Sequence, residues 1–194
     1  MFIELTDHLR CPADHDEAYL VLLPEQMDGR AVRSGALGCP VCGWATTVQE
    51  GVVDFGGGGR TDELAPVLTA EAIQAFLGLS GPGGYVALAG AVGGVAPALA
   101  ELMPGVRVVA VNPPGALLAD QPASVLRAGQ WPLKTSCLRG VAMAGPAAAD
   151  AAWVAAAAES VLPGLRIAVA GPRVDLPGFQ LLAATDTAWV AARK

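Results

Sequence analysis

The chain has 194 residues, of which 53% are hydrophobic and only 15% are charged, so it can bury a substantial core, and disorder of the whole chain is excluded. The formal net charge is −6. Residues 1–60 hold nine acidic residues against four arginines, and residues 61–194 hold nine acidic against eight basic residues. A protein that binds a phosphate backbone usually carries a basic stripe. The sequence has none, so we expect no nucleic-acid partner.

The first residues lack the basic and apolar regions of a secretory signal. One stretch, between Glu71 and Glu101, is free of charge and long enough to cross a membrane. However, the segment 80–84, Ser-Gly-Pro-Gly-Gly, interrupts it, and the remainder is mostly alanine and glycine. We therefore expect a buried strand and helix there, no contact with a membrane, and a cytoplasmic protein.

Three segments are expected along the chain. Residues 1–55 contain three of the four cysteines, with a strand over 44–48. Residues 56–82 begin with four glycines, which are typical of a flexible joint, and continue as a helix over 62–78. Residues 83–194 form the third segment. These ranges are the predicted domains: a small metal-binding module, a linker with a helix, and a larger α/β domain.

Short apolar strands alternate with alanine-rich helices in the third segment. The expected strands are 85–89, 106–111, 125–128, 140–145 and 165–170, and the expected helices are 90–102, 116–120 and 147–160. This alternation predicts right-handed crossovers and a mostly parallel sheet that is covered on both faces. The last two strands, 179–184 and 187–192, are too close for a helical crossover, so they should form an antiparallel hairpin at the sheet edge. The predicted fold class is a Rossmann-like α/β sheet with a small zinc-ribbon-like N-terminal module.

The cysteines indicate a metal site. Cys39 and Cys42 flank two residues and precede a glycine, a spacing that lets two thiolates face one ion from a tight turn. Cys11 is the third candidate ligand. The fourth is His15 or Asp14, and we favour His15 because imidazole is the commoner zinc ligand. His8 is a weaker candidate.

Two alternatives to a metal site stay open at this stage. A redox pair usually stands at a helix start, where a thiol pKa is lowered, whereas the residues after Cys42 are typical of a strand. The cysteines could also be reduced structural residues without a metal, because the fourth ligand is irregular. Cys137 stands apart from the group and is expected to be a small buried hydrophobe.

Residues 9–55 resemble the Trm112-like zinc-binding module. The resemblance rests on Leu-Arg-Cys-Pro at 9–12, Gly-Cys-Pro-Val-Cys-Gly at 38–43 and the strand-like stretch 46–55. In that family a Cys-Pro-x-Cys pair precedes a second Cys-x-x-Cys pair, whereas Asp14 stands at the second cysteine here. The resemblance implies structural zinc and a role as an activator of a methyltransferase, either bound to it or fused ahead of it.

Residues 83–194 resemble a short class I S-adenosylmethionine-dependent methyltransferase. That resemblance implies a cofactor site at a glycine-rich first turn, where Gly90 and Gly94 match two of three glycines, and at an acid after the second strand, where Asn112 stands instead. Val92 occupies the middle glycine position and Leu88 that of a preceding acid. The acid expected after the third strand is replaced by 128–130, and the loop 131–133 is expected to be packed.

With these anchors weakened together, we expect S-adenosylmethionine to bind weakly or not at all. The leading hypothesis is a non-catalytic zinc-binding protein, with no catalytic residues, that acts in binding or assembly. The alternative is an active methyltransferase with atypical cofactor motifs. The alanine-rich segment 147–158 contains a single acidic residue and carries Trp153 on an otherwise small-residue face, which predicts a protein partner or a homodimer.

Overall fold

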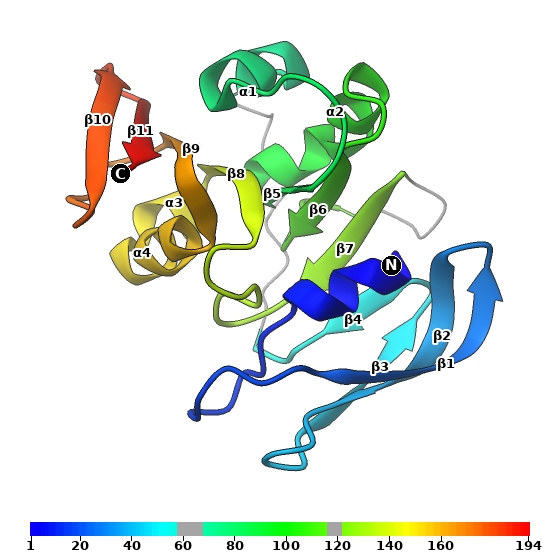
Figure 1. Ribbon diagram of the computed structural model, residues 1–194. Helices are drawn as coiled ribbons and strands as arrows, with labels where there is room; N and C mark the ends of the chain where they lie inside the picture. The colour runs from blue at the N-terminus through cyan, green and yellow to red at the C-terminus, as the bar shows by residue number, and fades with distance from the viewer. Residues whose placement is uncertain (58–67, 116–121) are drawn as a thin grey trace.

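One mixed sheet runs through the chain in the computed structural model, which describes residues 1–57, 68–115 and 122–194. In the described part the strand order is β1-β2-β3-β4-β7-β6-β5-β8-β9-β11-β10 (Figure 1). The strands are β1 (Val21–Asp28), β2 (Ala31–Gly38), β3 (Ala45–Gln49), β4 (Val52–Asp54), β5 (Tyr85–Gly90), β6 (Arg107–Val111), β7 (Ala123–Arg127), β8 (Leu138–Ala144), β9 (Val161–Ala170), β10 (Phe179–Ala184) and β11 (Trp189–Arg193). The helices are η1 (Ile3–His8), α1 (Ala70–Leu77), η2 (Ala91–Val95), α2 (Ala96–Leu102), α3 (Pro146–Ala149) and α4 (Ala151–Glu159), where η marks a 3-10 helix.

The C-terminal part has the architecture that the sequence predicts. Strands β7, β6, β5, β8 and β9 run parallel, β11 runs antiparallel to β9, and β10 pairs with β11 as the closing hairpin. The order of the parallel strands reverses between β5 and β8, which is the switch point of a Rossmann-like sheet. The mostly parallel α/β fold and its terminal hairpin are therefore confirmed.

The N-terminal strands β1, β2, β3 and β4 form an antiparallel meander. The strand expected over 44–48 is present as β3, but the β1–β2 hairpin is absent from the sequence-based prediction. Its signal is Gly29, the first of the two turn residues between β1 and β2, with a φ of +56°, since glycine at this position favours a tight hairpin turn. Strand β4 then pairs in parallel with β7, so the meander and the Rossmann-like sheet are continuous. The predicted domain boundaries stay a prediction.

Two apolar cores lie on opposite faces of the sheet. On one face α1, η2 and α2 cover residues such as Leu88 and Val108. On the other face η1, the loop after β7, α3 and α4 cover a core that includes Leu126, Met143 and Ile167 (Figure 1). This second core continues under the meander, where Leu37, Val48 and Val53 are buried. It joins the two parts of the chain into one packed body.

Two helix predictions differ from the structure. The helix expected over 147–160 is divided into α3 and α4, because Asp150 has an extended backbone and its carboxylate accepts hydrogen bonds from the backbone N–H groups of Ala152 and Trp153. The helix expected over 62–78 begins at Ala70, after the Thr69 cap, in the described part, and residues 62–67 lie outside it. The helix expected over 116–120 also lies outside the described residues.

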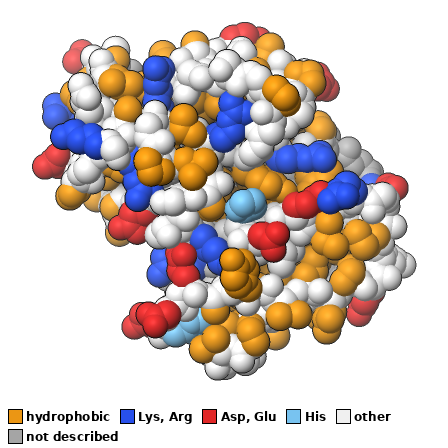
Figure 2. Space-filling model, viewed as in Figure 1, with side chains coloured by type: hydrophobic (Ala, Val, Ile, Leu, Met, Phe, Trp, Pro, Cys, Tyr) orange, Lys and Arg blue, Asp and Glu red, His pale blue; other side chains and the backbone are white. Residues whose placement is uncertain are grey.

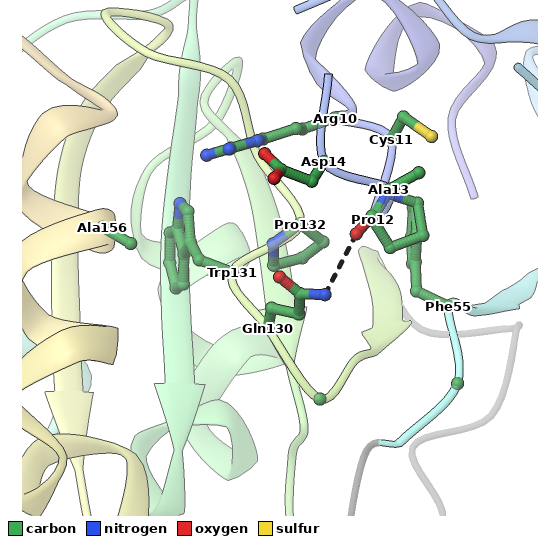
Figure 3. Close-up of a pocket in the computed structure, with 12 residues that line it drawn as sticks. Arg10, Cys11, Pro12, Ala13, Asp14, Phe55, Gln130, Trp131, Pro132 and Ala156 are labelled. Atoms are coloured by element: carbon green, nitrogen blue, oxygen red, sulfur yellow. Dashed lines mark hydrogen bonds between the residues drawn. The ribbon is translucent and has the colours of Figure 1, made fainter. Parts of the chain in front are cut away.

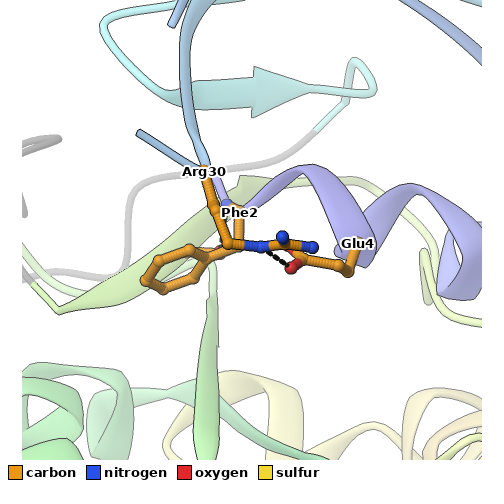
Figure 4. Close-up of polar contacts among 4 residues, drawn as sticks. Phe2, Glu4 and Arg30 are labelled. Atoms are coloured by element: carbon orange, nitrogen blue, oxygen red, sulfur yellow. Dashed lines mark hydrogen bonds and ion pairs between the residues drawn. The ribbon is translucent and has the colours of Figure 1, made fainter. Parts of the chain in front are cut away.

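The N-terminal residues fasten η1 to the sheet. The Phe2 N–H donates to the hydroxyl of the buried Ser124, and Glu4 forms an ion pair with Arg30 in the β1–β2 turn (Figure 4). The guanidinium of Arg107 lies 4.0 Å from the centre of the Phe2 ring. The start of the chain therefore links the meander to β6 and β7.

Candidate metal centre and cofactor crevice

The structure brings the four predicted metal ligands together. The ligand atoms of Cys11, His15, Cys39 and Cys42 all lie within 4.8 Å of one another. Cys11 lies in the loop after η1, in a segment that is held in place because the Arg10 N–H donates to the Pro132 carbonyl. Cys39 follows β2, and Cys42 lies in the turn before β3. Two loops far apart in sequence thus meet at one point.

The distances suit a tetrahedral ion. The sulfurs of Cys11 and Cys42 are 3.6 Å apart, and the Cys39 sulfur is 3.4 Å from His15 Nε2. Zinc–sulfur bonds of about 2.3 Å in a tetrahedron place sulfurs about 3.8 Å apart. The other ring nitrogen, His15 Nδ1, lies 2.6 Å from the backbone oxygen of Asp16. This contact orients the ring with Nε2 toward the sulfurs, which is the arrangement that metal-bound histidines usually have.

Backbone hydrogen bonds fix the turn at 39–44, which carries Cys39 and Cys42. The Cys39 N–H donates to the Trp44 carbonyl, and the Gly43 N–H, at a φ of +74°, donates to the Cys39 carbonyl. Trp44 N–H approaches Cys42 Sγ at 3.5 Å, and the Trp44 ring stacks on Phe55. A strand, not a helix, follows, so the helix dipole that lowers thiol pKa values in redox pairs is missing at Cys42.

The thiols of the cluster differ in how readily they ionise. Burial, joined by the neighbouring thiols of Cys42 and Cys39, raises the pKa of Cys11 to about 11. Burial also acts against the Cys39 thiolate, but hydrogen bonds from the backbone N–H groups of Cys42 and Val41, together with those from the thiols of Cys11 and Cys42, outweigh it and lower the pKa of Cys39 to about 6. One thiolate therefore forms readily and disfavours the next. A bound cation would remove this repulsion.

The two other candidate ligands lie outside the cluster. Asp14 contributes no atom to the four-residue group, although it neighbours the group in sequence. The His8 ring packs 4.7 Å from the Tyr85 ring, and burial lowers the pKa of His8. The thiol of Cys137, also apart from the group, is half-buried, and its pKa is raised to about 12 by burial.

The glycine turn after β5 is close-packed. Gly90 has a φ of +69°, and a Cβ there would lie 2.3 Å from the Ala144 carbonyl oxygen. Val92 is completely buried in η2, and a Cβ on Gly93 would lie 2.8 Å from a Pro113 side-chain carbon. The turn therefore packs closely against the segment that follows β6. Gly94 is exposed, with only a Pro114 side-chain carbon within 4 Å of its ideal Cβ position.

Asn112 uses its side chain within the protein. Its Nδ2 donates to the Ala128 carbonyl at 2.7 Å, and its Oδ1 accepts from the Ala128 N–H at 2.9 Å. The backbone of Asn112 is left-handed, with a φ of +49°, which asparagine tolerates better than most residues. The amide thus joins the end of β6 to the segment after β7. Both polar atoms of the amide therefore bond to the protein backbone.

The loop after β7 is packed, as the sequence predicts. The Trp131 indole is 5% exposed and donates to the hydroxyl of the buried Ser160 at 2.7 Å. The indole of Trp153, on α4, meets the Trp131 ring edge-on and donates to the Gly129 carbonyl. This helix packs against the sheet through Val154, with Ala157 and Ala158. The alanines of this helix and Trp153, on which the dimer prediction is based, therefore pack in large part against the core.

Comparisons with known proteins give structural neighbours only. No family model and no curated protein matches the sequence. The antibiotic-resistance methyltransferase Kmr is 16% identical, with a TM-score of 0.44, and the match covers 70% of this chain and 98% of that one. The pyocyanin biosynthetic protein PhzM is 16% identical, with a TM-score of 0.45 and coverage of 66% and 55%. Geranyl diphosphate C-methyltransferase from Streptomyces coelicolor A3(2) is 17% identical, with a TM-score of 0.43 and coverage of 52% and 41%. Likenesses this weak say nothing about activity, and the Rossmann-like assignment follows from the strand order of this chain.

The surface of the molecule is mixed in character. On the face in Figure 2, basic and acidic side chains are interspersed with hydrophobic ones and do not gather in a single-sign patch. Among the described residues, no helix is both long and apolar enough to span a bilayer.

Proposed function

We propose that this protein is a non-catalytic, zinc-stabilised, methyltransferase-like scaffold that acts by binding or assembly. The observation that carries the proposal is the engagement of Asn112, whose amide makes two hydrogen bonds with Ala128. A residue at this position serves a cofactor only when its polar atoms face the crevice. Here the same atoms hold two strand ends together.

The residues present do not fit S-adenosylmethionine. A charge-assisted bond to ribose is about twice as strong as a neutral one, and Asn112 supplies no charge. Val92 stands where the methyltransferase motif has its middle glycine and is completely buried in the core beside α2, and Pro113 packs against Gly93. A cofactor would have to displace these contacts. Affinity is therefore expected to be too weak for use in a cell.

The residues at 11–42 do fit zinc. Three sulfurs and one imidazole nitrogen within 4.8 Å form a donor set that zinc prefers. Cys11, His15, Cys39 and Cys42 would hold the ion, which would supply folding free energy to the two loops rather than chemistry. A site with four protein ligands has no open position for a substrate. We assign this part of the chain to a Trm112-like, zinc-ribbon-like module.

Self-association is the form of assembly that we propose. β10 is a sheet edge without charged residues, and its Leu181 and Leu182 side chains are 39% and 45% exposed. The opposite edge, β1, is protected by Pro24 and by acidic residues. A second copy could pair along β10, whereas pairing along β1 would bring acidic side chains together.

An active methyltransferase is the second candidate. It is favoured by the switch point between β5 and β8 and by Gly90, whose positive φ lets the backbone turn sharply at the end of β5. The two candidates differ in cofactor affinity. Calorimetric titration with S-adenosylmethionine and S-adenosylhomocysteine should give no saturable binding at micromolar concentrations. A micromolar dissociation constant for either compound would reject the scaffold proposal and favour the methyltransferase.

A further inference from the structure

A cavity lined by one basic and one acidic side chain lies at the seam between β4 and β7, away from the glycine turn. Its volume is about 290 Å³, near the lower end of the range for small-molecule sites. Phe55 and Gly56 border it just after β4, and Gly129 to Pro132 border it just after β7. The crevice outside the carboxyl ends of parallel strands is the usual place for a ligand in an α/β sheet. The metal-site loop, residues 10–14, forms the opposite wall.

Two opposite charges point into this cavity from one turn. Figure 3 shows the Arg10 guanidinium and the Asp14 carboxylate extending side by side from the loop toward Trp131 and Ala156. Within the described residues, neither side chain has a hydrogen bond or an ion pair. The neighbouring Gln130 is already engaged, since its amide donates to the Pro12 carbonyl at 3.0 Å. The cavity therefore presents one cation and one anion, both available to a ligand.

The charges of Arg10 and Asp14 determine which charges a ligand must carry. An anion would be attracted by Arg10 but repelled by Asp14, and a cation would be attracted by Asp14 but repelled by Arg10. A neutral apolar molecule would cover both charges without giving either a partner, which is costly. A zwitterion with adjacent charges satisfies both. Its carboxylate would receive two N–H bonds from the planar guanidinium, and its ammonium would face the carboxylate.

Apart from Gln130, the side chains of the remaining wall are apolar. Trp131 and Phe55 are largely buried, at 5% and 8% exposed, and Ala156 and Pro132 complete the surface. A short apolar side chain suits such a surface, because aromatic stacking would need more of the rings exposed. We propose that this cavity binds a free α-amino acid with an apolar side chain, held by Arg10 through its carboxylate and by Asp14 through its ammonium. The proposal goes beyond the scaffold function and does not depend on it.

The test uses three probes that differ in one charge each: L-leucine, N-acetyl-L-leucine, which lacks the ammonium, and L-leucinamide, which lacks the carboxylate. Titrations are followed by calorimetry and tryptophan fluorescence on the zinc-loaded full chain. We expect L-leucine to bind saturably and each derivative to bind at least about tenfold more weakly. No saturable binding of L-leucine up to about 10 mM, or equal affinity for all three probes, would overturn the proposal.

Two variants assign the charges. In Arg10→Gln the ligand carboxylate has no partner in the cavity, so L-leucine and L-leucinamide should bind with equal affinity. N-acetyl-L-leucine should still bind more weakly than L-leucine, because Asp14 is unchanged. In Asp14→Asn the reverse should hold, with L-leucine and N-acetyl-L-leucine alike. A variant that weakens all three probes by one common factor would contradict the assigned pairing. If either variant fails to fold, the probe series on the unmodified chain still decides. The S-adenosylmethionine titration has a separate outcome, so the two proposals can fail independently.

Discussion

Asn112 is the residue whose replacement tests the structural account most sharply. Asn112→Asp keeps an acceptor for the Ala128 N–H but removes the donor to the Ala128 carbonyl, which would then face a carboxylate. Leaving a partly buried carbonyl without its donor costs about 1–3 kcal/mol. Asn112→Ala loses two neutral bonds of about 1 kcal/mol each, and a left-handed alanine adds at least about 1 kcal/mol, for a total of about 3 kcal/mol.

Urea unfolding followed by tryptophan fluorescence measures both variants, with Gln49→Ala as the control. The Gln49 side chain is exposed and, in the described part of the chain, bonds only to the nearby Thr47 hydroxyl, so the control should stay within about 0.5 kcal/mol of the unmodified chain. Asn112→Asp should also gain no affinity for S-adenosylmethionine. An aspartate variant as stable as the original, or one that binds the cofactor more tightly, would show that Asn112 is a ligand-facing residue and would refute the reasoning.

Four further predictions follow from the described contacts. Protein purified without added metal should contain one zinc per chain, and His15→Ala should lower that content more than Asp14→Ala, because only His15 belongs to the cluster; the reverse order in elemental analysis would reassign the ligand. Gly90→Ala should destabilise by at least about 3 kcal/mol because it combines a left-handed backbone with a clash, whereas Gly164→Ala, with a φ of +80° and open space, should cost only about 1 kcal/mol; equal losses in urea unfolding would contradict the clash. Burial, aided by Arg33, lowers the pKa of the Met1 amino group from 8.0 to about 6. Between pH 6 and 8 the unfolded chain therefore binds more protons than the folded chain, so the free energy of unfolding should rise with pH over this range. Acetylation of the amine should abolish this rise. Light scattering should give a dimer mass that Leu182→Lys returns to the monomer mass, and a monomer at high concentration of the unmodified chain would remove the self-association proposal.

The sequence predicts the parallel sheet well because its central strands contain continuous apolar runs, such as 108–111 in β6, 141–144 in β8 and 167–170 in β9. Such runs belong to strands buried on both faces, and β5 is buried along its whole length. The β1–β2 hairpin is harder to predict, since β1 is exposed along most of its length and lacks the alternation that marks a half-buried strand. The division between α3 and α4 depends on one side chain, Asp150, whose cap outweighs the helical preference of the alanines around it.

The cluster of three cysteines and one histidine is predictable because the ligand chemistry of metals restricts the candidates to a few residues. The spacing of Cys39 and Cys42 identifies them as candidate ligands. The preference of zinc for imidazole over carboxylate favours His15, which lies beside them in the structure. The cavity between β4 and β7 could not be predicted from the sequence, for a different reason. Its walls come from residues 10–14, 55–56 and 129–132, which are brought together by the β4–β7 pairing. No local pattern indicates a pairing over that distance.

An amide-resolved NMR titration with S-adenosylmethionine tests the central claim most directly, because it reports both binding and its location. The zinc-loaded protein is labelled with ¹⁵N, and the signals of Gly90, Ala128 and the Asn112 side-chain amide are followed as the cofactor is added. The account predicts that these signals stay in place, since the Asn112 amide remains bonded to Ala128. Saturable shifts of all three signals at micromolar cofactor would contradict it and would place a working cofactor site at the end of β5.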